Sequence, residues 1–228
     1  ATPRALDLEE TIADRVQRLT DYQDADYAQQ YAEVIERIQA ADPRAQAVDS
    51  ITMAVARNLY KLMAYKDEYE VARLYSNGEF KQQLQEKFEG DFELRFNLAP
   101  PMFSKRDPET GHLLKREFGP WIMQAFALLA PFKFLRGTRL DLFGYTQERR
   151  QERQDIADYI ELLDQLSAGL DESNYEPALE LAQIPRELRG YGHVKDRNRE
   201  VLALRQSQLM RKFSGEPDTS VVKIVEAA

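Results

Sequence analysis

The 228-residue sequence contains no cysteine and only two histidines, His112 and His193. The missing thiols exclude disulfide bonds, cysteine nucleophiles, thiolate zinc sites and iron–sulfur clusters ligated by this chain. Two histidines in separate regions argue against a histidine-rich metal site. We therefore predict that this chain holds no metal and no redox cofactor.

Long apolar runs and an excess of positive charge are also missing. No run approaches the roughly 20 apolar residues of a membrane span. The N-terminal "ATPRALDLEE" lacks initiating Met and the charge, apolar block and cleavage site of a signal peptide. The net charge of −8 argues against a dedicated nucleic-acid binder, which needs a basic face. We expect a cytoplasmic chain that binds neither membranes nor nucleic acids.

Catalytic motifs are absent as well. The sequence has no phosphate-binding loop of the Walker type, no dinucleotide fingerprint, no nucleophile elbow and no zinc-protease helix. The "GDF" that begins at Gly90 lacks the downstream residues of a thiamine diphosphate motif. We therefore assign no catalytic residue.

Helical periodicity is the main signal that the sequence does contain. Residues 1–45 predict a helical hairpin that turns at "TDYQDAD" and ends before Pro43, since proline disfavours helix at the preceding residue. A helix is predicted at 49–78, where Asp49 or Ser50 can cap its start and Asn77 or Gly78 its end. Further helices are predicted at 79–90, 121–137 with a break at Pro131, 146–169, 174–185 and from about 193 to Phe213.

A short β-insertion interrupts this pattern. In "DFELRFNLA", residues 91–99, apolar and polar side chains alternate, and a period of two predicts a half-buried strand. The "DPETG" that follows has turn chemistry and predicts a hairpin. Trp121, the only tryptophan, begins the next helix and is predicted to be a core anchor.

The predicted fold is mainly α with a small antiparallel β-insertion, an α+β arrangement. We divide it into an N-terminal helical hairpin arm at 1–45, a helical domain at 46–213 with its β-hairpin near 91–118, and a C-terminal tail at 214–228.

Two polar segments are candidate functional surfaces. The first, "YKDEYEVARLY" at 65–75, is dense in tyrosine and charge. It is either a solvated helix face with ion pairs or an interface with another subunit, because tyrosine is enriched at interfaces. The interface candidates are Tyr65, Lys66, Asp67, Tyr69, Glu70 and Arg73.

The second segment is "RELRGYGHVKDRN" at 186–198. Glycine amides at a helix start, together with nearby cations, form a plausible anion site. The alternative is a corner between two helices, with His193 bonded to a carbonyl group. The anion-binding candidates are Arg189, Gly190, Tyr191, Gly192, His193 and Lys195.

Five segments together resemble one family. They are "VARNLYKLMAYKDEYEVARLY", "FEGDFELRFNLAPP", "KREFGPW", "FGYTQERR" and "RELRGYGHVKDRN". In this order they resemble the C-terminal region of bacterial fused indolepyruvate ferredoxin oxidoreductases, a region of unassigned function in that family. The resemblance extends from about Asp7 to Phe213.

The resemblance implies a parent enzyme that oxidatively decarboxylates aryl 2-oxo acids to acyl-CoA. It would use thiamine diphosphate and iron–sulfur clusters carried by other domains, and would pass electrons to ferredoxin. Expected partners are the catalytic domains of the same enzyme and a sister copy in a homo-oligomer. Two roles stay open: a non-catalytic assembly domain, or a domain whose Arg189–Lys195 corner binds a CoA phosphate or the 2-oxo acid carboxylate.

Overall fold

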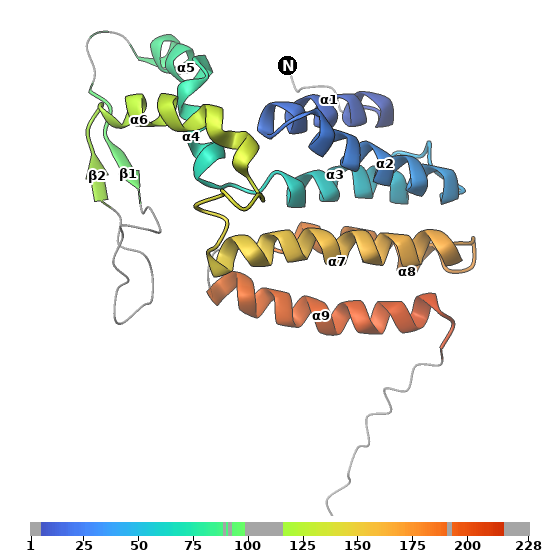
Figure 1. Cartoon of the computed structure of the whole chain (residues 1–228). Coiled ribbons are helices and arrows are strands. Elements are labelled where there is room, and N and C mark those ends of the chain that lie inside the picture. Colours follow the sequence, from blue (N-terminus) through green and yellow to red (C-terminus); the bar gives the residue numbers. More distant parts are fainter. Residues whose placement is uncertain (1–5, 89, 91–92, 99–115, 191–192, 217–228) are drawn as a thin grey trace, which may run out of the picture. The chain divides into compact units, whose positions relative to one another are not determined.

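The computed structural model describes residues 6–88, 90, 93–98, 116–190 and 193–216. These residues form helices and one small antiparallel sheet (Figure 1), which confirms the predicted fold class. The elements are α1 Leu8–Tyr22, α2 Ala25–Ala41, α3 Ile51–Met63, α4 Glu68–Ser76, α5 Glu79–Lys87, β1 Phe96–Leu98, β2 Arg116–Phe118, α6 Ile122–Leu129, the 3₁₀ helix η1 Ala130–Leu135, α7 Gln147–Gly169, α8 Tyr175–Glu187 and α9 His193–Phe213.

The chain divides into two compact units. Unit 1 comprises Ala1–Thr20, Ala25–Ala64 and Glu152–Ala228, and unit 2 comprises Asp21–Asp24 and Tyr65–Gln151. The division predicted from the sequence, into an arm that ends at residue 45, a domain that ends at residue 213 and a tail, stays a prediction. The "SVVKIV" of the predicted tail and the "DPETG" turn lie outside the described residues.

Unit 1 has an aliphatic helical core. Helix α3 packs against α2 and α8, and α9 packs against α8. Two buried tyrosines tie this core to helix backbones: the Tyr31 hydroxyl donates to the Ala56 carbonyl (2.8 Å) and the Tyr159 hydroxyl to the Ala182 carbonyl (2.7 Å). Each tyrosine buries a large ring while its hydroxyl keeps a partner. The largest buried aliphatic side chains of the unit include Leu19, Ile35, Ile51, Leu59, Leu163, Leu166 and Leu181.

The predicted single helix at 49–78 is wrong, because the structure breaks it into α3 and α4. Ser50 caps α3, its hydroxyl accepting from the Met53 amide at 3.1 Å, and the helix ends at Met63. Asp67 then has extended backbone angles, and its carboxylate accepts from the Glu70 amide at 2.8 Å. An N-cap residue cannot lie inside a helix, so the capping role of Asp67 separates the two helices.

Unit 2 is built around aromatic rings. The Tyr75 ring lies 4.8 Å from Phe80, 5.2 Å from Phe96 and 5.5 Å from Phe126, between ring centroids. These rings join α4, α5, β1 and α6, and aromatic pairs at such distances stabilise beyond the area they bury. Strands β1 and β2 pair antiparallel, with Phe96 opposite Phe118.

Candidate functional site

The predicted anion site lies at the corner between α8 and α9. Helix α8 ends at Glu187, and Gly190 follows with φ of +98°. A Cβ atom at Gly190 would lie 2.9 Å from Cγ1 of Val194, so both the backbone angle and the space require glycine there. Tyr191, Gly192 and the side chain of His193 lie outside the part of the chain that the structure describes.

Lys61 of α3 also reaches this corner, a contribution that sequence reasoning missed. Its ammonium group donates to the carbonyl groups of Pro185 (2.7 Å), Arg186 (3.2 Å) and Leu188 (3.0 Å). The last carbonyls of a helix lack intrahelical partners and carry partial negative charge, so a lysine stabilises them. Partial loss of water lowers the pKa of Lys61, and the charges of Arg189 and Lys195 lower it further.

Two further cations of the corner, Arg189 and Lys195, contact groups of unit 1. The Lys195 ammonium lies 3.4 Å from the Glu152 carboxylate and 3.9 Å from that of Asp155. The Arg189 amide donates to the Asn198 side-chain oxygen at 3.2 Å, and its Nε to the Arg186 carbonyl at 3.3 Å. Lys195 is therefore paired with carboxylates, whereas the Arg189 guanidinium makes one long bond to a carbonyl, and anion binding here stays a prediction.

The segment 65–75 places a buried ion pair inside unit 2. The Asp67 carboxylate accepts from Nε and Nη2 of Arg136, at 2.5 and 2.9 Å, and both side chains are only 3% exposed. Nη1 of Arg136 donates to the Tyr22 carbonyl at 2.6 Å, and the guanidinium lies 3.6 Å from the centroid of the Tyr22 ring. Burial by itself lowers the pKa of Arg136, but the hydrogen bonds and charge of Asp67, together with the nearby Tyr22 and Tyr65, outweigh this and raise it.

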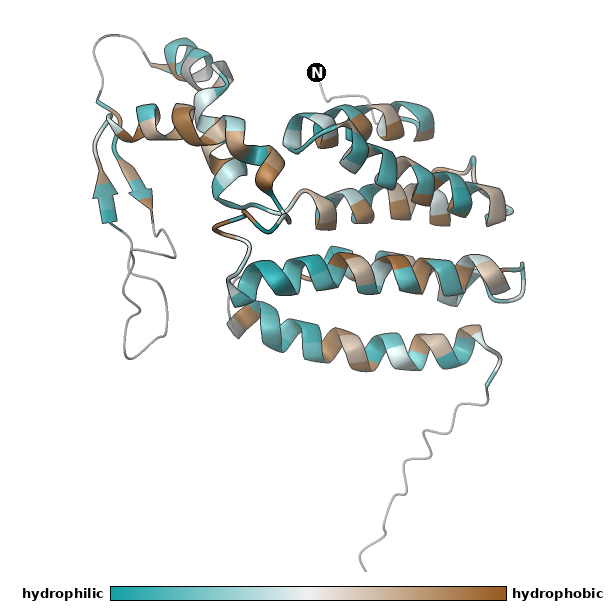
Figure 2. Cartoon of the chain, viewed as in Figure 1, coloured by the Kyte–Doolittle hydropathy of each residue, from teal (hydrophilic) through white to brown (hydrophobic). Residues whose placement is uncertain are grey.

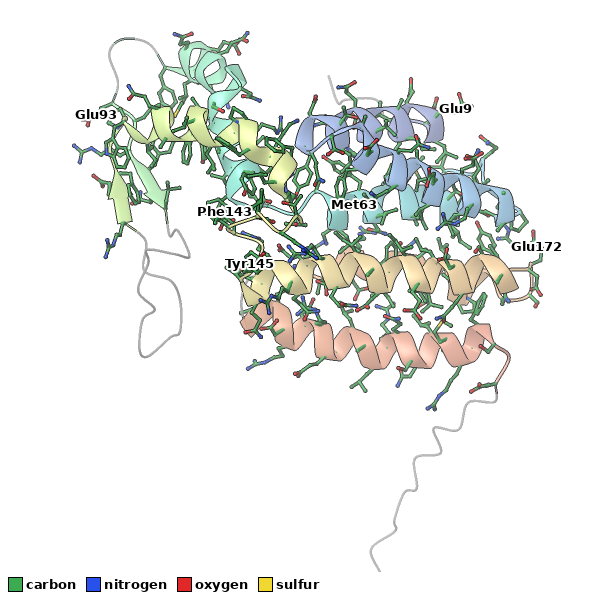
Figure 3. All side chains as sticks on the ribbon, in the orientation of Figure 1. Glu9, Met63, Glu93, Phe143, Tyr145 and Glu172 are labelled. Carbon is green, nitrogen blue, oxygen red and sulfur yellow. The ribbon has the colours of Figure 1, made fainter. Side chains whose placement is uncertain are left out.

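Asp141 extends this buried network. Its carboxylate accepts from the amides of Gly137 (2.8 Å) and Gly144 (2.9 Å) and from the Tyr69 hydroxyl at 3.4 Å. The Tyr69 ring meets Phe143 edge to face at 5.2 Å between centroids, where Phe143 lies in the loop between η1 and α7 (Figure 3). Burial, and then the Asp141 charge, raises the pKa of Tyr69 to about 12.

The network changes the interpretation of the predicted interface residues. Tyr65, Asp67 and Tyr69 are buried, and only Lys66 is exposed among the six; Glu70 pairs with Arg73 at 2.8 Å. Buried side chains cannot contact another subunit while unit 2 stays folded. All three nitrogens of the Arg136 guanidinium donate hydrogen bonds, and this permanently charged group offers no nucleophile or proton-transfer group.

A different surface of unit 2 is exposed and apolar. We define the apolar face as Trp121, Leu128, Phe132 and Phe134, whose exposed fractions are 59%, 73%, 44% and 57%. The prediction that Trp121 anchors the core is therefore wrong. Its neighbour Ile122 is buried instead, together with Phe126, against Ala72 and Phe96. Sequence reasoning missed the face, although the signal was there: Gln124 is the only polar residue of α6, so apolar residues outnumber those that one buried side needs.

No group of three or more His, Cys, Asp or Glu side chains that could hold a metal occurs among the described residues. Within the same residues, none of the helices has the length and apolar character needed to cross a bilayer.

Comparison with known protein families identifies a family that covers most of the chain. The model of a family of unknown function, DUF6537, matches residues 8–208. The chain belongs to this family. No curated protein and no solved structure matches it. Because the matched range takes in all of unit 2 and most of unit 1, the corner at 186–199, the buried network and the apolar face are all parts of this DUF6537 chain.

Proposed function

We propose that this chain is a non-catalytic domain that supports the assembly of a larger enzyme. Its five sequence segments resemble the C-terminal region of fused indolepyruvate ferredoxin oxidoreductases. The parent enzyme would convert aryl 2-oxo acids and CoA to acyl-CoA, with electron transfer to ferredoxin. The catalytic domains of that enzyme and a sister copy are the proposed partners.

The apolar face is the observation that supports an assembly role most directly. Large apolar side chains are usually buried, because each one that stays exposed forgoes roughly 1.5–3 kcal/mol of burial. Four such side chains, three of them aromatic, are exposed along α6 and η1. Exposed apolar patches of this kind mark sites of protein–protein contact.

The residues of this chain do not fit the parent's redox cofactors. Iron–sulfur clusters are held by cysteine thiolates, and the sequence has no cysteine. It also has no complete thiamine diphosphate motif. In this proposal both cofactors belong to other domains, and the chain contributes only surfaces.

Reconstitution tests the proposal. The catalytic region of an indolepyruvate ferredoxin oxidoreductase is made without this segment, and the purified chain is then added. We expect the two to co-elute in size-exclusion chromatography and the yield of active, assembled enzyme to rise, measured as indolepyruvate-dependent ferredoxin reduction. The chain alone should reduce no ferredoxin. Turnover by the chain alone, or a catalytic region that assembles fully and ignores the added chain, would refute the proposal.

Anion binding at the corner is the second candidate function. The observation that favours it is that Lys61 reaches the carbonyls of Pro185, Arg186 and Leu188 and so adds a third cation to the corner that holds Arg189 and Lys195. Arginine suits a phosphate or a carboxylate through paired hydrogen bonds.

Calorimetry with CoA and with indolepyruvate tests this second candidate. If the site exists, titration of the chain with one of these ligands should give a saturable binding heat, and Arg189→Ala and His193→Ala should each abolish it. Arg37→Ala, which removes an exposed pair with Asp164 on α2 and α7, is the matched control and should leave the heat unchanged. Heat that survives both corner variants would exclude the site.

A further inference from the structure

Helix α6 and the following η1 present two apolar sides. The inner side packs Ile122, Phe126 and the half-buried Met123 and Leu129 into the aromatic core of unit 2. On the outer side, Trp121 and Leu128 are seven residues apart and share one stripe of the helix, with the exposed polar Gln124 between them, and the exposed Phe132 follows in η1. Phe134 joins the stripe, its ring centroid 6.3 Å from that of Phe132. Figure 2 shows hydrophobic colour along α6.

This apolar face is almost free of charge. Between Trp121 and Leu135 the only charged residue is Lys133, which is half-buried and donates to the Asp21 carbonyl at 2.6 Å. The next charge along the chain, Arg136, is buried in its pair with Asp67. The face therefore presents apolar and aromatic groups with no charge directed outward from its own stripe.

The lack of charge bears on which partner fits. In a two-fold pair the same patch meets itself, so every charge at its centre would face a like charge. A surface that recognises a different protein usually carries charges that fix the register and exclude other partners. A charge-free apolar stripe brings no like charges together in a two-fold pair. It also lacks the charges with which a surface selects a different protein.

Unit 2 is also the part of the chain through which two copies meet with the least repulsion. Its sequence has 15 acidic and 14 basic residues, a net charge of −1. The remaining 24 acidic and 17 basic residues give unit 1 a net charge of −7. Like-charged surfaces within about 10 Å repel at ordinary ionic strength, so contact through unit 1 is disfavoured.

We propose that a second copy of this chain binds the apolar face, so that the α6–η1 stripes of two copies pack against each other in a two-fold pair. This inference rests on the proposed assembly role and names its partner and surface. Full burial of an aromatic side chain covers about 150–250 Å², so the face offers on the order of 400 Å². That is about half of the ~800 Å² that each partner buries in a standard interface, which indicates a reversible dimer.

Sedimentation velocity of the full 228-residue chain tests the dimer. Across roughly 1–200 μM we expect a monomer–dimer equilibrium that persists in 1 M salt, because no ion pair holds it and salt screens only the repulsion between copies. Leu128→Glu and Phe132→Glu should each weaken dimerisation at least about tenfold, since each places a carboxylate against its own copy. The matched control is Leu204→Glu, at a side chain 70% exposed on α9, which should leave the equilibrium unchanged.

Trp121 gives an independent signal because it is the only tryptophan and lies on the face itself. Its emission should shift to the blue and acrylamide quenching should fall as concentration rises, in wild type and Leu204→Glu but not in Leu128→Glu. Far-UV circular dichroism confirms that the variants are folded. A chain that stays monomeric throughout, or a dimer that Leu204→Glu breaks as readily as Leu128→Glu, overturns the inference. If the monomeric chain still binds the catalytic region, the proposed assembly role survives while self-pairing does not.

Discussion

The two units of this chain are stabilised by different kinds of core. Unit 1 has long helices, an aliphatic core, and buried tyrosines whose hydroxyls donate hydrogen bonds to backbone carbonyls. Unit 2 has short helices, a cluster of aromatic rings and a buried Arg136–Asp67 pair. Core composition and helix length therefore vary together within one chain.

The surfaces of the two units differ as much as their cores. Unit 1 carries the net charge of −7, and its exposed ion pairs join neighbouring helices. Unit 2 is close to neutral and exposes the apolar face. A strongly charged surface is suited to water, whereas a neutral one with exposed aromatic side chains resembles the core of an interface. The contrast in charge and exposed aromatic side chains supports the proposal that unit 2 is the unit that associates.

Loss of the buried pair should give the largest effect and should fall on unit 2. In Asp67→Ala, Arg136 is left as an uncompensated buried charge and α4 loses its N-cap, so we expect the free energy of unfolding of unit 2 to fall by about 3–5 kcal/mol. Urea unfolding followed by the fluorescence of Trp121 measures this, since that tryptophan belongs to unit 2.

A double variant sharpens the interpretation. Asp67→Leu with Arg136→Met removes both charges and should cost clearly less than Asp67→Ala, because no lone charge stays buried. Equal losses in the two variants would show that the cap and the packing matter and that the ion pair does not. An unchanged urea midpoint in Asp67→Ala would show that unit 2 does not depend on this network.

The long helices of unit 1 could be predicted because their signals are local. Thr146 and Gly169 bracket α7, and the Thr146 hydroxyl accepts from the Arg149 amide at 3.3 Å. The spacing of apolar residues lies within each helix, so the pattern alone predicts where it runs. Local signals also predicted a small β-insertion, because alternation indicated a strand at 91–99 and "DPETG" a hairpin; the structure confirms a two-stranded antiparallel sheet.

The features that the sequence did not reveal depend on distant partners. Asp67 ends the predicted long helix and pairs with Arg136, 69 positions further on. Lys61 caps α8 through carbonyls at least 124 positions away. For α6 the sequence predicts a helix but not which side faces inward, because both sides are apolar. Trp121 was therefore placed in the core, although Ile122 and Phe126 occupy that position.

Alkaline pH should destabilise unit 1 more than unit 2. Burial raises the pKa of Tyr31 and Tyr159 in unit 1, and that of Tyr69 in unit 2 to about 12. Unfolded tyrosine ionises near pH 10, so above that pH the unfolded state binds fewer protons than the folded state. Stability is complete below pH 10 and falls by up to about 1.4 kcal/mol per pH unit for each tyrosine. At pH 11 we therefore expect a larger loss in unit 1, where burial raises the pKa of at least two tyrosines, than in unit 2.

Paired measurements separate the two units in alkali. Circular dichroism follows the helices of the whole chain, and Trp121 fluorescence follows unit 2. Tyr31→Phe with Tyr159→Phe should flatten the pH dependence of the first signal while leaving the second as it was. If the double variant loses stability above pH 10 as steeply as the wild type, these two tyrosines are not its cause.

An exposed ion pair of unit 1 should give the smallest effect. Arg205 of α9 donates to Glu187 at 2.5 Å and to Glu180 at 3.1 Å, both on α8, so its geometry is as close as that of Arg136. Water screens the exposed charges, and ordering the long side chains costs entropy, so Arg205→Ala should cost about 0.2–1 kcal/mol. Urea unfolding by circular dichroism, with and without 1 M salt, measures it, and the difference between variant and wild type should shrink in salt. A loss approaching that of Asp67→Ala would mean that proximity of charges sets stability in both units, and the contrast between a buried and an exposed pair would then fail.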